Sequence, residues 1–190
     1  MATSRKRLPN DAKPMAQASS SRSVRASVEA TCSQYFRANL NRNDTLCIAL
    51  SGGLDSMALL EAANRLREAL SFKLIALHVN HQLNPNADAW SRFCQHQCDQ
   101  RAIPLQISTV AIKRTRGTSL EALARDARYA EFRAVNADVI AVAQHLDDQA
   151  ETFLLQLLRG AGMRGLSAMG AISRIGSTKV IRPLLGLPRT

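Results

Sequence analysis

The sequence predicts an α/β fold, a doubly wound, mainly parallel five-stranded sheet with helices on both faces. Two observations support this prediction. Short apolar runs alternate with amphipathic helical patterns over most of the 190 residues, and polar clusters directly follow several of those runs. Strands that are buried on both faces are nearly continuous apolar runs, and helical connections join parallel neighbours through right-handed crossovers.

The five expected strands are the apolar runs themselves. They are TLCIAL (45–50), FKLIALHV (72–79), PLQISTV (104–110), DVIAVA (138–143) and TKVIRPLL (178–185). Their lengths are typical of strands, and each is separated from the next by a segment of a different pattern.

Helices are expected where apolar residues recur every three to four positions. The segments with this pattern are 24–40, 56–70, 86–101, 119–136 and 147–159. Ser119 and Glu121 open the fourth of these with residues typical of a helix start. Four of the helices lie between successive strands, as βαβ units require.

The charge of the chain is uneven as well as strongly positive. The net charge is +10, and the chain has no acidic residue after Glu151 although six Lys or Arg residues follow it. Residues 1–22 are rich in Ser, Arg, Ala and Pro without apolar periodicity, so we expect a disordered basic leader before a domain at 23–190. A basic end favours a polyanionic partner such as nucleic acid, and a solvated basic surface is the alternative.

Several classes of protein do not fit the composition. No apolar run approaches the ~20 residues of a membrane span, and the start lacks the apolar centre of a secretory signal. We therefore expect no membrane association and a cytoplasmic protein, with an organelle as the alternative because the leader is rich in Arg and Ser. The scattered cysteines Cys32, Cys47, Cys94 and Cys98 fit reduced, packed thiols better than a zinc or redox site.

Polar clusters stand at the ends of three predicted strands. SGGLDS (51–56) follows the first strand, HVNHQL (78–83) ends the second, and AQHLDDQAET (143–152) follows the fourth. Parallel strands of a doubly wound sheet bind ligands beyond their carboxyl ends, at a switch in strand order. The three clusters are therefore expected to face one crevice.

The segment SGGLDS has the chemistry of an anion-binding turn. Gly52 and Gly53 let backbone amides approach a phosphate closely, and the hydroxyls of Ser51 and Ser56 add donors beside a helix N-terminus. Asp55 would repel a phosphate unless Mg²⁺ bridges the two. The segment lacks the lysine of a Walker loop, and a simple helix cap by Asp55 or Ser56 is the alternative.

SGGLDS after a buried strand resembles the pyrophosphate loop of the ATP-pyrophosphatases, the PP-loop superfamily. Within it, four further stretches resemble the tRNA(Ile)-lysidine synthetases. They are HVNHQLNPNADAW (78–90), SLEALARDARYAEF (119–132), QHLDDQAETFLLQLLRGAGMRGLSAM (144–169) and IRPLL (181–185). The resemblance implies an adenine-nucleotide α-hydrolase-like, Rossmann-like fold, and it identifies 23–190 as the PP-loop ATP-binding catalytic domain.

The resemblance also implies a reaction, that of an ATP-dependent carbon–nitrogen ligase. ATP would adenylate the 2-carbonyl oxygen of the wobble cytidine in tRNA(Ile) with a CAU anticodon. The ε-amine of L-lysine would then attack that carbon, giving lysidine and releasing AMP after pyrophosphate. ATP and Mg²⁺ are the implied cofactors, and members of this family often form homodimers.

The resemblance assigns roles to particular residues. The ATP-binding residues would be Ser51, Gly52, Gly53, Leu54, Asp55, Ser56 and His78, with Asp55 also a ligand of Mg²⁺. Asp148 and Glu151, three residues apart on one helical face, would hold the incoming lysine; an acidic first turn is the alternative. Arg125, or else Arg128, would stabilise charge on the α-phosphate, against the alternative of exposed helix arginines.

The chain departs from the family pattern in three ways. Gln144 stands where a histidine is common, and Gln82 where a glycine is frequent. Family members usually continue well beyond IRPLL, so we expect the C-terminal part of the usual enzyme to be missing here. The alternatives are a PP-loop tRNA thiolation enzyme, an ammonia-dependent amidating enzyme, or a truncated ATP-binding module without activity of its own.

Overall fold

The computed structural model describes residues 13–112, 117–160 and 169–189. It contains one six-stranded sheet with the strand order β3-β2-β1-β4-β6-β5. The strands are β1 Thr45–Ala49, β2 Lys73–Asn80, β3 Leu105–Thr109, β4 Val139–Ala141, β5 Ile172–Ile175 and β6 Thr178–Ile181. The predicted α/β class and mainly parallel sheet are confirmed, since only the pairing of β5 with β6 is antiparallel.

The sheet has one strand more than the sequence predicted. β5 forms a hairpin with β6 in which Ile175 pairs with Thr178, and Gly176 in the turn adopts a φ of 59°. A single residue of β5 is buried, so the strand lacks the apolar run by which the others were found. The expected strand at 178–185 ends early, because Arg182 begins a turn closed by the bond from Leu185 N to Arg182 O.

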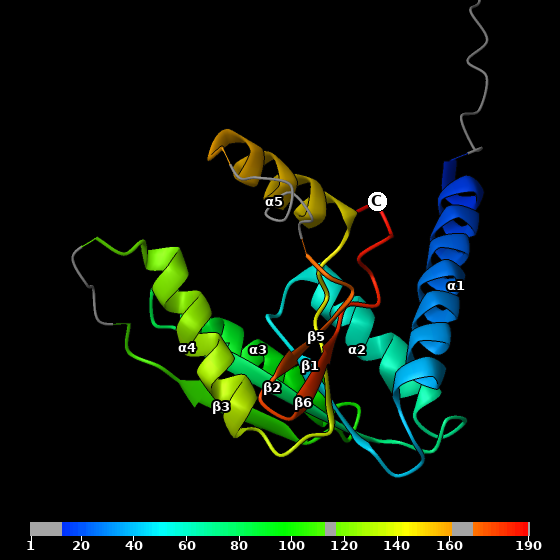
Figure 1. Cartoon of the computed structure of the whole chain (residues 1–190). Coiled ribbons are helices and arrows are strands. Elements are labelled where there is room, and N and C mark those ends of the chain that lie inside the picture. Colours follow the sequence, from blue (N-terminus) through cyan, green and yellow to red (C-terminus); the bar gives the residue numbers. More distant parts are fainter. Residues whose placement is uncertain (1–12, 113–116, 161–168, 190) are drawn as a thin grey trace, which may run out of the picture.

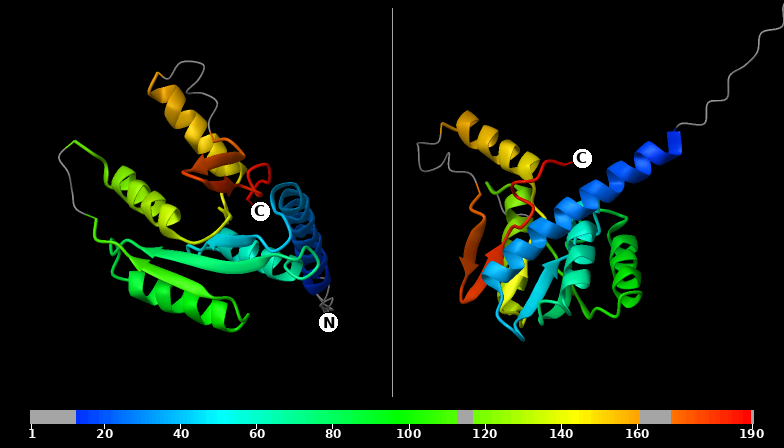
Figure 2. Two further views of the ribbon diagram at one scale, coloured as in Figure 1. Left: turned by 60° about the horizontal axis from the view of Figure 1, so that its bottom comes forward. Right: turned by 90° about the vertical axis from the view of Figure 1, so that its right-hand side faces the viewer.

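Helices cover both faces of the sheet. They are α1 Lys13–Asn39, α2 Leu54–Leu66, α3 Ala87–Asp99, α4 Leu120–Ala134 and α5 Leu146–Leu158. In the left view of Figure 2 the sheet lies between α4 (yellow-green, above) and α3 (green, below). Side chains of β1 alternate between the two cores: Leu46 and Ile48 pack with α1, α2 and α3, whereas Cys47 packs with Phe132 of α4.

The first helix begins earlier than expected. The sequence predicted disorder up to residue 22, but α1 is helical from Lys13, so residues 13–22 correct that prediction; residues 1–12 lie outside the described part. The segment has no glycine, and its one proline, Pro14, falls in the first turn, where its missing N–H costs no helical hydrogen bond. The later part of α1 is packed in the core through Cys32 and Phe36, and residues 13–22 continue this helix without an apolar stripe of their own.

All four cysteines are buried and unpaired, as the sequence predicted. Burial raises the pKa of Cys47 to about 12, and burial with the nearby charge of Glu29 raises that of Cys32 to about 12. These thiols therefore stay protonated. Among the described residues, no helix has the length and apolarity that a bilayer crossing demands.

The strand order changes direction between β1 and β4. The chain runs from β1 outward through β2 to β3, and then returns to place β4 on the other side of β1. Helix α5 leaves the carboxyl end of β4, and in Figure 1 the C-terminus lies beside its first turn. The crevice expected at a topological switch point therefore opens where β1 and β4 end.

Candidate functional site

A cavity of about 560 Å³ occupies this crevice. Its walls come from the segments that follow β1, β2 and β4, and from side chains of α3, α4 and the C-terminal segment. Among the lining residues are Ser51, Gly53, Asp55, Ser56, His78, Asn80, His81, Trp90, Arg128, Gln144, His145, Asp148 and Arg189. The structure thus brings the three polar clusters together, as parallel strands with a common carboxyl edge require.

The loop after β1 is a tight turn held by its own hydroxyls. Ser51 Oγ accepts a hydrogen bond from the Gly53 amide at 3.2 Å and donates to Ser56 Oγ at 3.1 Å, and Ser56 Oγ donates to the Gly53 carbonyl at 2.9 Å. Gly52 has a φ of +85°, and a Cβ there would lie 3.1 Å from Cys94 Sγ. Only glycine fits this conformation and this approach without strain.

Helix α2 begins directly from the loop, with Gly53 as the N-cap and no side-chain capping bond. Asp55 and Ser56 lie inside its first turn, which contradicts the alternative that either is a simple cap. An uncapped helix N-terminus beside a cavity presents amide donors and a positive dipole end to an anion. Leu54 also starts this helix, but it is 68% exposed, so only its backbone is suited to that role.

His145 stands between two carboxylates of the cavity. Its Nε2 lies 3.7 Å from Asp55 Oδ2 and its Nδ1 lies 3.5 Å from Asp148 Oδ2. Asp148 Oδ2 also accepts a 2.8 Å hydrogen bond from the His145 amide, which fixes the start of α5. Asp55 Oδ2 lies 3.7 Å from Arg189 Nε as well, so a cation of the C-terminal segment faces the same carboxylate.

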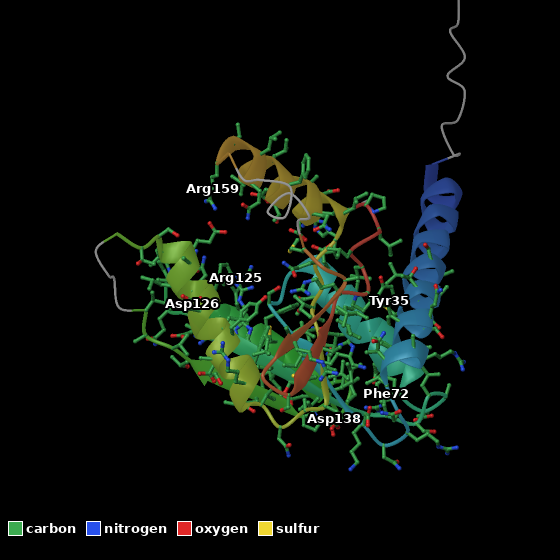
Figure 3. All side chains as sticks on the ribbon, in the orientation of Figure 1. Tyr35, Phe72, Arg125, Asp126, Asp138 and Arg159 are labelled. Carbon is green, nitrogen blue, oxygen red and sulfur yellow. The ribbon has the colours of Figure 1, made fainter. Side chains whose placement is uncertain are left out.

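The two arginines of α4 are placed differently. Arg128 lines the cavity, whereas Arg125 donates from Nη2 to Tyr129 Oη at 3.1 Å, with its guanidinium 4.9 Å from the Tyr129 ring centre. Figure 3 labels Arg125 on the upper half of α4. Surrounding protein and the positive charge of Arg125 lower the pKa of Arg128, although its side chain is open to the cavity. Of the two, Arg128 is therefore the arginine that faces the cavity.

Two histidines line the cavity wall that follows β2. His78 is buried, and its Nδ1 lies 2.8 Å from the Leu50 carbonyl oxygen, which can only accept; Nδ1 therefore carries the proton. Burial, with the charges of Arg128 and His78, lowers the pKa of His81, so His81 is neutral near pH 7. The His78 ring is thus held in place by the Leu50 carbonyl, and His81 adds a neutral ring to the same cavity wall.

Some predicted residues lie elsewhere, and some lining residues were not predicted. Glu151 is exposed on α5 and does not line the cavity, so the structure does not bring it beside Asp148 at the wall. Sequence reasoning did not assign Trp90 or Arg189. Trp90 ends one of the quoted motifs and could have been noticed there, whereas Arg189 carries no local signal because its place depends on how the chain returns to the cavity.

The donor set limits which metal the cavity suits. Across the described ranges, no three His, Cys, Asp or Glu side chains converge in an arrangement for a metal ion. Asp55 offers a hard carboxylate oxygen whose contacts at 3.7 Å with His145 and Arg189 are longer than hydrogen bonds. A cation at Asp55 would thus need further ligands from a bound phosphate and water, which is how Mg²⁺ usually binds with nucleotides.

Fold and site together define an α/β nucleotide-binding domain with an anion-binding loop at the switch point. The PP-loop domain family matches residues 24–190, and the chain belongs to that family. This match supports ATP as the nucleotide of the cavity.

Two bacterial relatives of this chain are both tRNA(Ile)-lysidine synthases. The chain is 46% identical over 158 residues to the tRNA(Ile)-lysidine synthase of Nitrosomonas europaea, covering 82% of this chain and 34% of that protein. It is 50% identical over 147 residues to the tRNA(Ile)-lysidine synthase of Chromobacterium violaceum, covering 75% and 33%. The chain thus spans about a third of the length of these relatives.

A solved structure confirms the fold alone. The U34-tRNA thiolase NcsA of Methanococcus maripaludis superposes with a TM-score of 0.72 at 20% identity, covering 86% of this chain and 60% of that one.

Proposed function

We propose that this chain is the ATP-binding catalytic part of a tRNA(Ile)-lysidine synthetase, an ATP-dependent carbon–nitrogen ligase. The observation that carries the proposal is the convergence of the SGGLDS loop, Asp148 and Arg128 on one cavity. Identity of 46–50% to lysidine synthases across these segments supports it. In the proposed reaction, ATP activates the 2-carbonyl oxygen of the wobble cytidine and the ε-amine of lysine displaces AMP.

The loop and α2 would hold the pyrophosphate half of ATP. The first-turn amides of α2 supply neutral donors, which bind phosphate without an obligatory lysine. Mg²⁺ at Asp55 would neutralise the phosphates when bound. Arg128, in the opposite wall on α4, would meet charge that develops on the α-phosphate, because a guanidinium matches phosphate oxygens in geometry.

Asp148 would hold the lysine substrate. Its side chain is 39% exposed and one oxygen already accepts from the His145 amide, so the other remains for an ammonium group. His145, buried between Asp148 and Asp55, lies within 3.5 Å of the same carboxylate and is suited to accept a proton when the amine becomes the nucleophile. Glu151 lies outside the cavity wall, so it would contact lysine only while lysine moves toward the cavity.

One rival function is favoured by a specific observation. An ATP-binding module without activity of its own fits the same geometry, because the loop and the first turn of α2 that would hold the phosphates both belong to the described residues. Thiolation is disfavoured, because all four cysteines are buried and burial raises the pKa of Cys94 and Cys98 to about 11. A sulfur-transfer chemistry needs an accessible thiolate or metal-binding thiols.

The deciding experiment measures transfer of radiolabelled lysine to tRNA(Ile) with a CAU anticodon, in the presence of ATP and Mg²⁺. Asp148→Asn removes the proposed lysine contact, and Asp147→Asn, an exposed neighbour in the same first turn, is the matched control. Incorporation that Asp148→Asn loses and Asp147→Asn keeps would support the proposal. Mg²⁺-dependent ATP binding without incorporation would favour the module, and no ATP binding would refute both.

A further inference from the structure

The indole of Trp90 is open to the nucleotide cavity, and we propose that it stacks on a nucleobase bound there. Trp90 is 48% exposed and lines the cavity with Ser51 and Gly53 of the loop. The proposal rests on the proposed function in taking a nucleotide as the ligand, and it adds a residue that contacts the base. It concerns recognition of the base, whereas the residues discussed above concern phosphates and the amine.

Trp90 stands on backbone that is held in place from both sides. Asn80, buried at the end of β2, donates from Nδ2 to Asp88 Oδ1 at 2.9 Å and to Ser91 Oγ at 3.1 Å. These two acceptors flank Trp90 in the sequence, and the Trp90 amide itself donates to the Asn86 carbonyl at 3.0 Å. The ring is thus presented by a fixed first turn of α3, which lowers the entropy cost of stacking a ligand on it.

The aromatic side of α3 also adjoins the phosphate loop. Phe93, one helical turn after Trp90 and 43% exposed, has its Cδ1 3.7 Å from the position of a Cβ built on Gly52. The buried side of the helix consists of Ser91, Cys94 and Cys98. The helical period places Trp90 and Phe93 on another side of α3, so their exposure follows from helix geometry and not from loose packing. A ligand that touches the loop with its phosphates is therefore next to this aromatic surface.

The charge of the cavity indicates which planar ligand fits. Arg128 and Arg189 line the same cavity as the indole, so the site combines cationic groups with an aromatic face. Nucleotides carry the matching pair, an anionic phosphate and a base with a π face, and base–aromatic stacking tolerates any base. The base of ATP and an unpaired base of RNA share this chemistry, so the test separates the two sources.

Trp90 is the sole tryptophan of the sequence, so its fluorescence reports this position alone. The 190-residue chain would be titrated with three probes: ATP with Mg²⁺, an RNA stem-loop with a CAU anticodon, and inorganic tripolyphosphate with Mg²⁺. We expect quenching by ATP, by the RNA, or by both, and little change with tripolyphosphate, which carries no base. Equal quenching by tripolyphosphate and the base-bearing probes would refute stacking.

Binding to variants gives the second readout. For the probe that quenches, we expect Trp90→Leu to weaken binding about tenfold, and Trp90→Phe, which keeps an aromatic face, to restore most of it. Tripolyphosphate should bind both variants as it binds the parent chain, which shows that the loop and fold are intact. Equal loss of tripolyphosphate affinity in Trp90→Leu would instead mean a structural role and overturn the inference.

The inference and the proposed function fail in different ways. If ATP binds in an Asp55-dependent manner but no base-bearing probe quenches Trp90 and the Leu variant binds normally, the inference is wrong and the proposed function stands. If the RNA quenches Trp90 while ATP does not bind, the stacking inference stands and the proposed ATP-dependent function fails. Absence of quenching by every base-bearing probe overturns the inference in all cases.

Discussion

Replacement of Gly52 by alanine tests whether the geometry of the phosphate loop is set by backbone conformation and by close packing together. Gly52 has a φ of +85°, and a Cβ there would lie 3.1 Å from Cys94 Sγ. The left-handed conformation costs an alanine about 1–2 kcal/mol. Overpacking against a buried side chain adds about 1–3 kcal/mol. We therefore expect Gly52→Ala to lower the free energy of unfolding by about 2–5 kcal/mol.

The chain contains a control that separates the two contributions. Gly117 has nearly the same φ, +87°, but a Cβ there would meet nothing within 4 Å. Gly117→Ala should therefore cost only the backbone part, about 1–2 kcal/mol. Urea unfolding followed by circular dichroism gives both free energies. If Gly52→Ala proves no more destabilising than Gly117→Ala, the contact with Cys94 carries no energetic weight and the packing argument is wrong.

The same pair of variants has a functional readout. Gly52→Ala displaces the loop amides relative to α3, so Mg²⁺-dependent ATP binding should weaken, whereas Gly117→Ala should leave it unchanged. Measurement at a temperature where both variants are fully folded removes the stability difference. Equal ATP affinity in the two variants would show that the loop tolerates a shift of its backbone.

Three further predictions concern the rest of the domain. Hydrogen bonds from Arg65 and Arg101 lower the pKa of Glu61 below its ordinary 4.5. The Glu61 carboxylate therefore stabilises the fold above pH 4.5, and this contribution is lost as the pH falls through the lowered pKa. The difference in unfolding free energy between the parent chain and Glu61→Gln should shrink in urea titrations at acid pH, and a constant difference would contradict the assignment. Arg182 is 4% exposed and donates to Gln144, the Gly170 carbonyl and Ser173. Arg182→Met should lower the free energy of unfolding in urea by about 3 kcal/mol, because these acceptors lose charged donors. A loss below about 1 kcal/mol would show that the acceptors find other partners. The four buried thiols have pKa values raised to about 11–12, so at pH 8 they should react with a thiol reagent only when the chain unfolds. Fast labelling of the native chain would refute their burial.

The sequence was most informative where burial leaves a continuous pattern. β1, β2 and β4 are covered on both faces, so their apolar runs were visible, and the polar residues just beyond them had to converge in a parallel sheet. β5 was not visible because one side chain of its four is buried; the Gly176-Ser177 pair was the available turn signal. Lys13–Asn39 forms a helix whose start has no apolar stripe, so periodicity could not reveal it.

The site could be predicted in kind but not in detail. Arg125 and Arg128 share one helical face, and the sequence cannot tell which of them meets the cavity, because that depends on how α4 is rotated against the sheet. Tyr129 and Phe132 decide it: the Phe132 side chain is buried in the core, and Tyr129 binds Arg125. Arg189 reaches Asp55 only after the chain has returned past β6, a long-range contact without a local pattern.

Helix α5 projects from the end of the sheet, and no side chain of it is buried within the described part of the chain, although Phe153, Leu154, Leu157 and Leu158 are apolar. A helix of this length without tertiary packing is marginally stable in water. Its first turn is nevertheless tied down, by the His145–Asp148 bond and by two hydrogen bonds between Gln149 and Met169. Amide exchange should therefore be slow at the end that carries Asp148 and become rapid toward Leu158, so Asp148, proposed above to hold lysine, keeps its position while the rest of its helix opens and closes.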